Sequence, residues 1–203
     1  MEPLQFYQQR LQELKIELKK LQQRKSAFAW LRLGAIIAII VGFYFLWSMG
    51  IIYVIIASVL LLFIFTRLIY ADLKNQSNIE HTNYLIRINE DELKCLAGNY
   101  YNFESGSEHI PKEHPYANDL DIFGRASIFQ YINRSTSEPG SKELAEYLKS
   151  PASIPDIKQR QEAIKELSTK ILWIQDLQSL GKKNKITFSA QSRLEAWMKD
   201  PPV

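Results

Sequence analysis

The fold is decided by one stretch of the chain, residues 33–66, which reads LGAIIAIIVGFYFLWSMGIIYVIIASVLLLFIFT. These thirty-four residues carry no formal charge. As one continuous helix they would extend ~51 Å at ~1.5 Å per residue, whereas the hydrocarbon core of a bilayer is ~30 Å thick. The stretch is too long for one membrane span, so it predicts a transmembrane hairpin of two short helices, residues 33–47 and 51–66.

The turn of this hairpin is predicted at Trp47-Ser48-Met49-Gly50, because glycine tolerates turn geometry and tryptophan prefers the membrane interface. A cleaved signal peptide would instead have one shorter apolar region close to the N-terminus. A buried hairpin inside a soluble protein is the other alternative. It is disfavoured because the rest of the chain offers too little apolar surface to cover two helices that are hydrophobic all round.

Basic residues flank only the outer ends of the apolar stretch. Residues 1–32 carry seven Lys and Arg against three Asp and Glu, and the predicted turn carries none. Lys and Arg are retained on the cytosolic side of a membrane, so both termini are predicted to be cytosolic. Arg32 and Arg67 would then extend their side chains to the same interface.

The remainder of the chain, residues 67–203, is close to neutral, with eighteen basic and nineteen acidic residues. Proteins that bind nucleic acid by themselves usually present a basic face, so this balance argues against autonomous DNA or RNA binding. Cys95 is the only cysteine. It can form no internal disulfide and no multi-cysteine metal site, which indicates a reducing compartment.

Residues 1–32 are predicted to form a cytosolic amphipathic helix with coiled-coil periodicity. Its apolar positions alternate spacings of three and four: Leu4, Tyr7, Leu11, Leu14, Leu18 and Leu21. Such a seam has to pack against another apolar surface, either a second copy of the chain or the cytosolic part of the same chain. A third option is a helix lying on anionic lipid headgroups.

Beyond the hairpin, residues 67–115 are predicted to form a helix that stops at Gly98 and then a loop linker, and residues 116–203 a helical domain. The helices expected in that domain cover residues 122–134, 138–149, 153–181 and 189–199, with Ser137 and Ser153 as N-caps. No segment alternates as a strand would. The predicted fold class is therefore all-α.

The run from His114 to Pro151, HPYANDLDIFGRASIFQYINRSTSEPGSKELAEYLKSP, and the IKQRQEA segment at 157–163 resemble the core of MutS-type DNA mismatch-repair proteins. The likeness is closer to the membrane-anchored MutS-like proteins of bacteria and covers residues 80–202. The residues that match the family pattern are Asp119, Asp121, Gly124, Ser127, Asn133, Ser137, Gly140, Leu144, Leu148, Pro151 and Arg160. Ser137 stands where the family usually has Thr, and Lys142 where it often has Arg.

This resemblance implies a partial MutS core domain, residues 116–203, in a multi-pass protein of the bacterial inner membrane. The matched positions are mostly structural in the family, which binds ATP and Mg in a C-terminal ABC-type ATPase domain. No phosphate-loop pattern G-x-x-x-x-G-K-[ST] occurs in this chain, and the Phe-x-Glu wedge of mismatch readers is missing too. ATP and Mg are therefore expected only for an ATPase domain absent from this chain, which itself is expected to hold no cofactor.

The resemblance favours a non-catalytic membrane-anchoring and core (lever) segment of an ATP-dependent, DNA-binding protein. The partners it implies are the lipid bilayer and a second copy, held through the missing ATPase domain or through the N-terminal heptads. DNA would be bound only by the complete protein. The alternative is a free-standing membrane adaptor that acts by helix-mediated protein contacts. An enzyme in its own right has little support.

Four loop residues could bind zinc if the chain folded them together: Glu108, His109, Glu113 and His114. They lack cysteine support, so ordinary loop positions are the favoured interpretation. No catalytic, cofactor-binding or metal-binding residue is predicted.

Two further clusters have plainer explanations than a binding site. Asp119 and Asp121 form a D-x-D pair, but they are expected just before a helix, where carboxylates favour the helix dipole. The KKNK run at residues 182–185 could contact phosphate, although a solvated loop after a helix C-terminus explains it as well.

Overall fold

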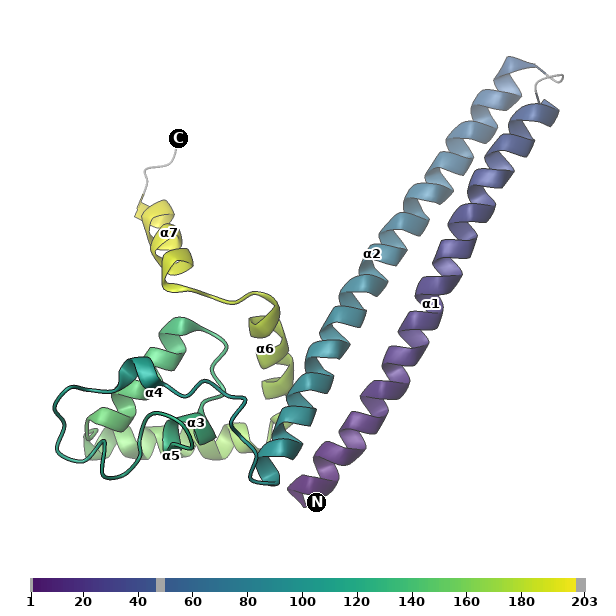
Figure 1. Cartoon of the computed structure of the whole chain (residues 1–203). Coiled ribbons are helices and arrows are strands. Elements are labelled where there is room, and N and C mark those ends of the chain that lie inside the picture. Colours follow the sequence, from purple (N-terminus) through teal and green to yellow (C-terminus); the bar gives the residue numbers. More distant parts are fainter. Residues whose placement is uncertain (1, 47–49, 200–203) are drawn as a thin grey trace. The chain divides into compact units, whose positions relative to one another are not determined.

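In the computed structural model, residues 2–46 and 50–199 are described, and every regular element among them is helical (Figure 1). The elements are α1 (Pro3–Leu46), α2 (Ile51–Leu96), the 3-10 helix η2 (Ser107–His109), α3 (Ile128–Ile132), α4 (Glu138–Lys149), α5 (Ile154–Ser168), α6 (Ile171–Lys183) and α7 (Phe188–Lys199). One isolated bridge joins Ser137 and Ile186. The all-α class is confirmed.

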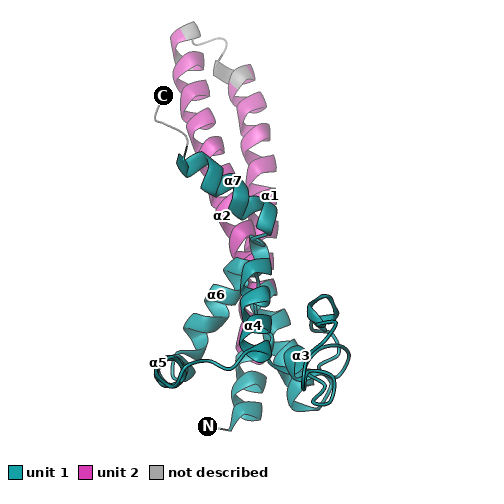
Figure 2. Cartoon of the chain, turned by 90° about the vertical axis from the view of Figure 1, so that its left-hand side faces the viewer, with its two compact units in different colours: residues 1–10, 84–203 teal, residues 11–83 magenta. Residues whose placement is uncertain are grey.

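The chain divides into two compact units (Figure 2). The hairpin unit is residues 11–83, and the helical unit is residues 1–10 together with 84–203. Both long helices contribute to both units, because α1 begins in the helical unit and α2 ends there.

In the hairpin unit, α1 and α2 run antiparallel and side by side (Figures 1 and 2). Leu14 and Leu21 of the N-terminal seam are buried, and the Asn75 side-chain amide donates to the Leu21 carbonyl oxygen over 3.0 Å. Of the alternatives for the seam, packing on the same chain is therefore the one that the structure shows. Thr82 and Ile79 are buried on α2 in the same unit.

The helices are longer than the predicted spans. The amphipathic arm and the first apolar segment form one helix, α1, because no Gly or Pro interrupts residues 11–33. In the same way α2 continues from the second apolar segment to Leu96, where Gly98, with φ 81°, provides the predicted stop. Both helices are long and apolar enough to cross a membrane. Of the predicted turn, residues 47–49 lie outside the described part of the chain.

Two helix predictions for residues 116–203 are wrong in their extent. The helix expected at 122–134 is reduced to α3, because Gly124 and Ala126 have φ of 101° and 64°, which interrupts a right-handed helix. The helix expected at 153–181 is two helices. The hydroxyl of Thr169 donates to the Glu166 carbonyl oxygen and closes the end of α5, and α6 then starts at Ile171.

The bounds predicted for α4 and both predicted N-caps are confirmed. Helix α4 has the predicted bounds, and its N-cap Ser137 accepts a hydrogen bond from the Gly140 amide. Ser153 caps α5 in the same way through the Asp156 amide. The loop before α3 packs around Phe129, whose side chain is fully buried. A Cβ atom at Gly106 would lie only 2.5 Å from the Phe129 ring, so this position has no room for a side chain.

Candidate functional site

The apolar halves of α1 and α2 are almost entirely uncovered. The most apolar part of α1 has 0 % of its residues buried, and that of α2 has 6 %. Isoleucine, leucine and valine side chains therefore project outward from both helices, and Phe63 does so from α2. The alternative of a hairpin buried within this same chain does not hold for the described residues. An exposed apolar surface of this kind marks a membrane contact or a large protein interface.

One end of this apolar surface is marked by aromatic and charged side chains. Trp30 and Tyr70 are 71 % and 68 % exposed. Between the helices, Arg32 Nη2 lies 3.0 Å from Asp72 Oδ2, and the Asp72 side chain is only 15 % exposed. Arg67, also exposed, follows the second apolar segment directly. Aromatic rings and long basic side chains at such a boundary are typical of the interface between lipid and water.

In the helical unit, Arg134, which lies just after α3, forms hydrogen bonds through its whole guanidinium group. Its Nε and Nη2 atoms donate to the two carboxylate oxygens of Glu92 over 2.5 and 3.1 Å. Nη1 donates to the carbonyl oxygens of Tyr131 and Asn133, and Nη2 also donates to Cys95 Sγ. These contacts engage all five N–H groups of the guanidinium. Arg134 therefore joins the C-terminal part of α2 to the segment between α3 and α4.

Charge and an aromatic ring reinforce this junction. The guanidinium carbon of Arg134 lies 3.9 Å from the centroid of the Phe103 ring. Burial by itself would lower the pKa of Arg134, but the hydrogen bond and the negative charge of Glu92 outweigh it, so the pKa is raised. Arg134 is thus held in its charged form and serves to hold the unit together.

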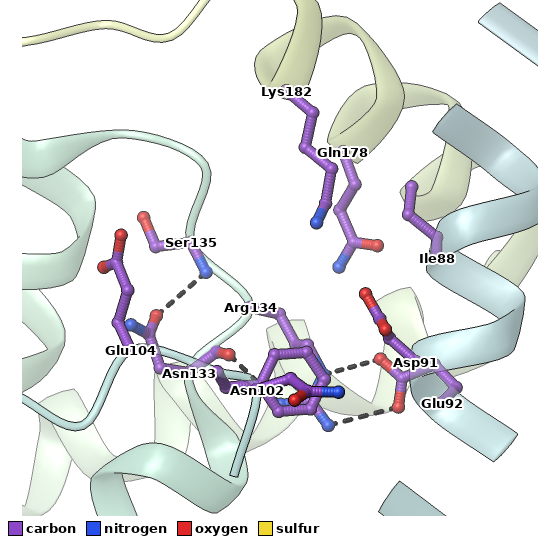
Figure 3. Close-up of a pocket in the computed structure, with 11 residues that line it drawn as sticks. Ile88, Asp91, Glu92, Asn102, Glu104, Asn133, Arg134, Ser135, Gln178 and Lys182 are labelled. Carbon is purple, nitrogen blue, oxygen red and sulfur yellow. Dashed lines mark hydrogen bonds and ion pairs between the residues drawn. The ribbon is translucent and has the colours of Figure 1, made fainter. Parts of the chain in front are cut away.

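A pocket of about 230 Å³ opens beside this pair (Figure 3). Its lining comes from α2, the loop before α3, the α3–α4 segment and α6: Ile88, Asp91, Glu92, Asn102, Phe103, Glu104, Asn133, Arg134, Ser135, Gln178 and Lys182. Most of its charges are already matched: Asp91 pairs with Lys94, Glu92 with Arg134, and Glu104 lies 3.5 Å from Lys185. The pocket is polar, and its three carboxylates each face a basic side chain: Glu92 faces Arg134 within the lining, and Asp91 and Glu104 face Lys94 and Lys185 outside it.

A buried pair of amides joins α2 to α6. The Gln175 Nε2 atom donates to Asn89 Oδ1 over 3.1 Å, and Asn89 Nδ2 donates to the Leu85 carbonyl oxygen over 2.8 Å. Both side chains are buried. Amides that satisfy each other in this way fix the register of two helices, because any shift would leave buried polar groups without partners.

The loop histidines have structural contacts. His114 Nδ1 accepts from the backbone amide of Ala117, while its Nε2 donates to the Lys149 carbonyl oxygen over 2.8 Å. It thereby ties the loop to the end of α4. His109 packs edge-on against Phe129, with its Nε2 3.5 Å from Glu108 Oε1. In the described part of the chain, no group of three or more His, Cys, Asp or Glu side chains is arranged to hold a metal ion.

The D-x-D pair does not directly precede a helix in the sequence, contrary to the expectation. Asp119 and Asp121 lie in a turn, Asp121 has φ 47°, and α3 begins only at Ile128. The turn folds back onto the start of this helix, because the Asp121 carbonyl oxygen accepts a hydrogen bond from the Ile128 amide over 3.1 Å. The KKNK run falls at the end of α6, where Lys182 lines the pocket and Lys185 approaches Glu104.

Sequence reasoning missed the Arg134 and Asn89 clusters. Glu92 and Arg134 are 42 positions apart, and Asn89 and Gln175 are 86 apart. Polar residues on the otherwise apolar face of α2 were the available signal, since a polar side chain at a buried position requires a partner. The identity of each partner depends on how α2 packs against the elements that follow.

Comparison with known proteins adds no relative. No protein-family model, curated protein or solved structure matches this chain.

Proposed function

We propose that this chain anchors a MutS-like helical core segment to a membrane and is not catalytic by itself. The observation that carries the proposal is the uncovered apolar surface of the paired helices α1 and α2. Exposing such a surface to water would be strongly unfavourable, because each buried apolar side chain is worth ~1.5–3 kcal/mol relative to its exposed state. A bilayer covers it without any protein partner.

The length of the apolar segments supports a short hairpin that spans the bilayer. Residues 33–46 would extend ~21 Å and residues 51–66 ~24 Å along their helices, against a hydrocarbon thickness of ~30 Å. One further turn of each helix, ~5.4 Å, brings these lengths to ~26 and ~29 Å and reaches Trp30 and Tyr70. Arg32, paired with Asp72, then lies at the edge of the hydrocarbon. This arrangement leaves both termini in the cytosol, as the basic flanks predict for a bacterial inner-membrane protein.

The MutS-like assignment rests on the motif at residues 114–151 and is supported by the roles that its residues adopt. Ser127 and Ser137 cap helices, and Asn133 accepts a hydrogen bond from the Ser135 amide. At Gly140 a Cβ atom would lie 2.6 Å from Ser135 Oγ, so only glycine fits without displacement. These are structural roles, as the resemblance implies for a core and lever segment.

Membrane integration is tested by extraction and topology. After alkaline carbonate treatment the chain should remain in the membrane pellet, and a reporter fused after residue 80 should be active only as a cytosolic reporter. Release into the soluble fraction, or periplasmic reporter activity, would refute the anchor.

The MutS-like part is tested on the gene. An in-frame phosphate loop of the form G-x-x-x-x-G-K-[ST] downstream of residue 203 is the expected result, with ATP and Mg bound by that domain and not by this chain. A stop codon directly after residue 203 would contradict it. Calorimetry with ATP provides a second check, because saturable micromolar binding to this chain would require a site that its sequence does not provide.

A membrane adaptor is the second candidate, favoured by apolar side chains left exposed in the helical unit. They include Ile154 and Ile164 on α5, Trp173 on α6 and Trp197 on α7. Surfaces of this kind commonly dock a protein partner. The stop codon that would contradict the MutS-like proposal is the result that the adaptor predicts.

A further inference from the structure

A dense group of cations surrounds one end of the apolar hairpin. We name it the basic collar, and its members are Lys19, Lys20, Arg24, Lys25, Arg32, Arg67 and Lys74. Residues 19–32 of α1 contain no acidic residue, and residues 67–76 of α2 contain only Asp72. All of these positions belong to the hairpin unit.

Contacts between the two helices place the two basic segments of the collar alongside each other. Asn75 bonds the Leu21 carbonyl oxygen, Lys25 Nζ lies 2.8 Å from Gln76 Oε1, and Arg32 pairs with Asp72. This register places the basic part of α1 beside the basic part of α2. The collar therefore follows directly on the apolar surface and the exposed rings of Trp30 and Tyr70.

The charges of the collar are poorly compensated by the protein. Arg32 has an acidic partner, and Lys25 bonds a neutral amide. Within the described residues, the other five members have no acidic partner, and all five are exposed: Lys19, Lys20, Arg24, Arg67 and Lys74. Like charges at this density repel one another unless anions from outside neutralise them.

We infer that the basic collar binds the anionic headgroups of phospholipids and so concentrates acidic lipid around the hairpin. The inference rests on the proposed membrane function and goes beyond it, because retention of basic residues in the cytosol requires no particular lipid. The occupant follows from chemistry: cations directly beside an apolar surface meet lipid phosphates, and long basic side chains reach them from the edge of the hydrocarbon.

The test uses the full chain reconstituted in phosphatidylcholine vesicles that contain a trace of spin-labelled phosphatidylglycerol or spin-labelled phosphatidylcholine. Electron paramagnetic resonance measures the fraction of label that is motionally restricted beside the protein. We expect about a fivefold larger relative association constant for phosphatidylglycerol, which corresponds to ~1 kcal/mol. Raising the salt from ~0.1 to ~1 M shortens the Debye length from ~10 to ~3 Å and should reduce this preference.

The collar variant combines Lys20→Gln, Arg67→Gln and Lys74→Gln. These substitutions remove three exposed charges from both helices while leaving the Arg32–Asp72 pair in place. The preference for phosphatidylglycerol should fall to less than half of the wild-type value. A collar variant that keeps the full preference would overturn the inference.

The matched control combines Lys158→Gln, Lys165→Gln and Arg193→Gln. It also removes two lysines and one arginine, but from exposed positions on α5 and α7. Its lipid preference should equal that of the wild type. A fall as large as that of the collar variant would show that net charge, and not the collar, sets the preference, which also overturns the inference.

The outcomes separate this inference from the proposed function. If neither labelled lipid shows a restricted component and carbonate releases the chain, the membrane anchor itself is refuted. If both lipids are restricted to the same degree, the anchor stands and the collar inference falls.

Discussion

Arg134→Met should destabilise the helical unit by ~2–4 kcal/mol. Removing one member of a buried ion pair costs ~3–5 kcal/mol, because the other charge stays behind without a partner. Here the side chains of Arg134 and Glu92 retain 24 % and 18 % exposure, so water reduces that cost somewhat. The two carbonyl oxygens that accept from Nη1 also lose their donor, while methionine keeps most of the side-chain volume.

Cys95 makes this loss measurable in the full chain. It is the only cysteine, it is buried, and it lies in the helical unit. When local opening is fast relative to modification, the rate of thiol labelling is proportional to the opening equilibrium. A destabilisation of ~2–4 kcal/mol should therefore accelerate labelling by ~30- to ~1000-fold. The hairpin unit does not need to unfold for this signal to appear.

Two variants exclude simpler explanations. Arg134 contacts Cys95 Sγ, so removing Arg134 could expose the thiol directly. Glu92→Gln keeps the contact between Arg134 and Cys95 but removes the negative charge that Arg134 pairs with. This variant should therefore also accelerate labelling. Arg193→Met, on the exposed face of α7, should have no effect. If Arg134→Met is labelled within about threefold of the wild-type rate, equal to ~0.7 kcal/mol, the ion pair does not stabilise the unit and the reasoning is refuted.

Three more predictions concern the same unit. Asn89→Leu should cost ~1–3 kcal/mol in the same labelling assay, because it leaves its buried amide partner on α6 unsatisfied; a neutral result would contradict this. Gly106→Ala should cost ~2–4 kcal/mol through strain and a clash with Phe129. Gly98 also has a positive φ, 81°, but has open space around it, so Gly98→Ala should lower the free energy of unfolding by only ~1–2 kcal/mol. Thermal unfolding measures both variants, and an equal loss of stability for Gly98→Ala and Gly106→Ala would argue against the clash. Burial raises the pKa of Tyr7 above 10.0, so its contribution to stability is complete below pH 10.0 and is lost as the pH rises through the folded-state pKa. The difference between absorbance titrations of wild type and Tyr7→Phe should have its midpoint above pH 10.0, and a lower midpoint would refute the burial argument.

Much of the fold could be predicted because it depends on local signals. The charge-free run at 33–66 specifies two apolar helices, since its composition leaves no polar face for any other element. Helix α4 was predicted with its observed bounds, because Ser137 caps its first turn and the chain beyond Lys149 leads into Pro151. The extent of α3 could not be predicted, because left-handed backbone at Ala126 has no clear signature in the sequence.

The sequence by itself determined the all-α class, the apolar hairpin and the positions of most helix ends, because each depends on residues within one or two turns of each other. The N-terminal seam was also visible, but the sequence left open what it packs against. Only the tertiary structure decided that Leu14 and Leu21 are covered within the chain and that Arg134 takes Glu92 as its partner. The physical reason is that these contacts join residues dozens of positions apart, and a buried seam or charge specifies that it needs a partner without specifying which one.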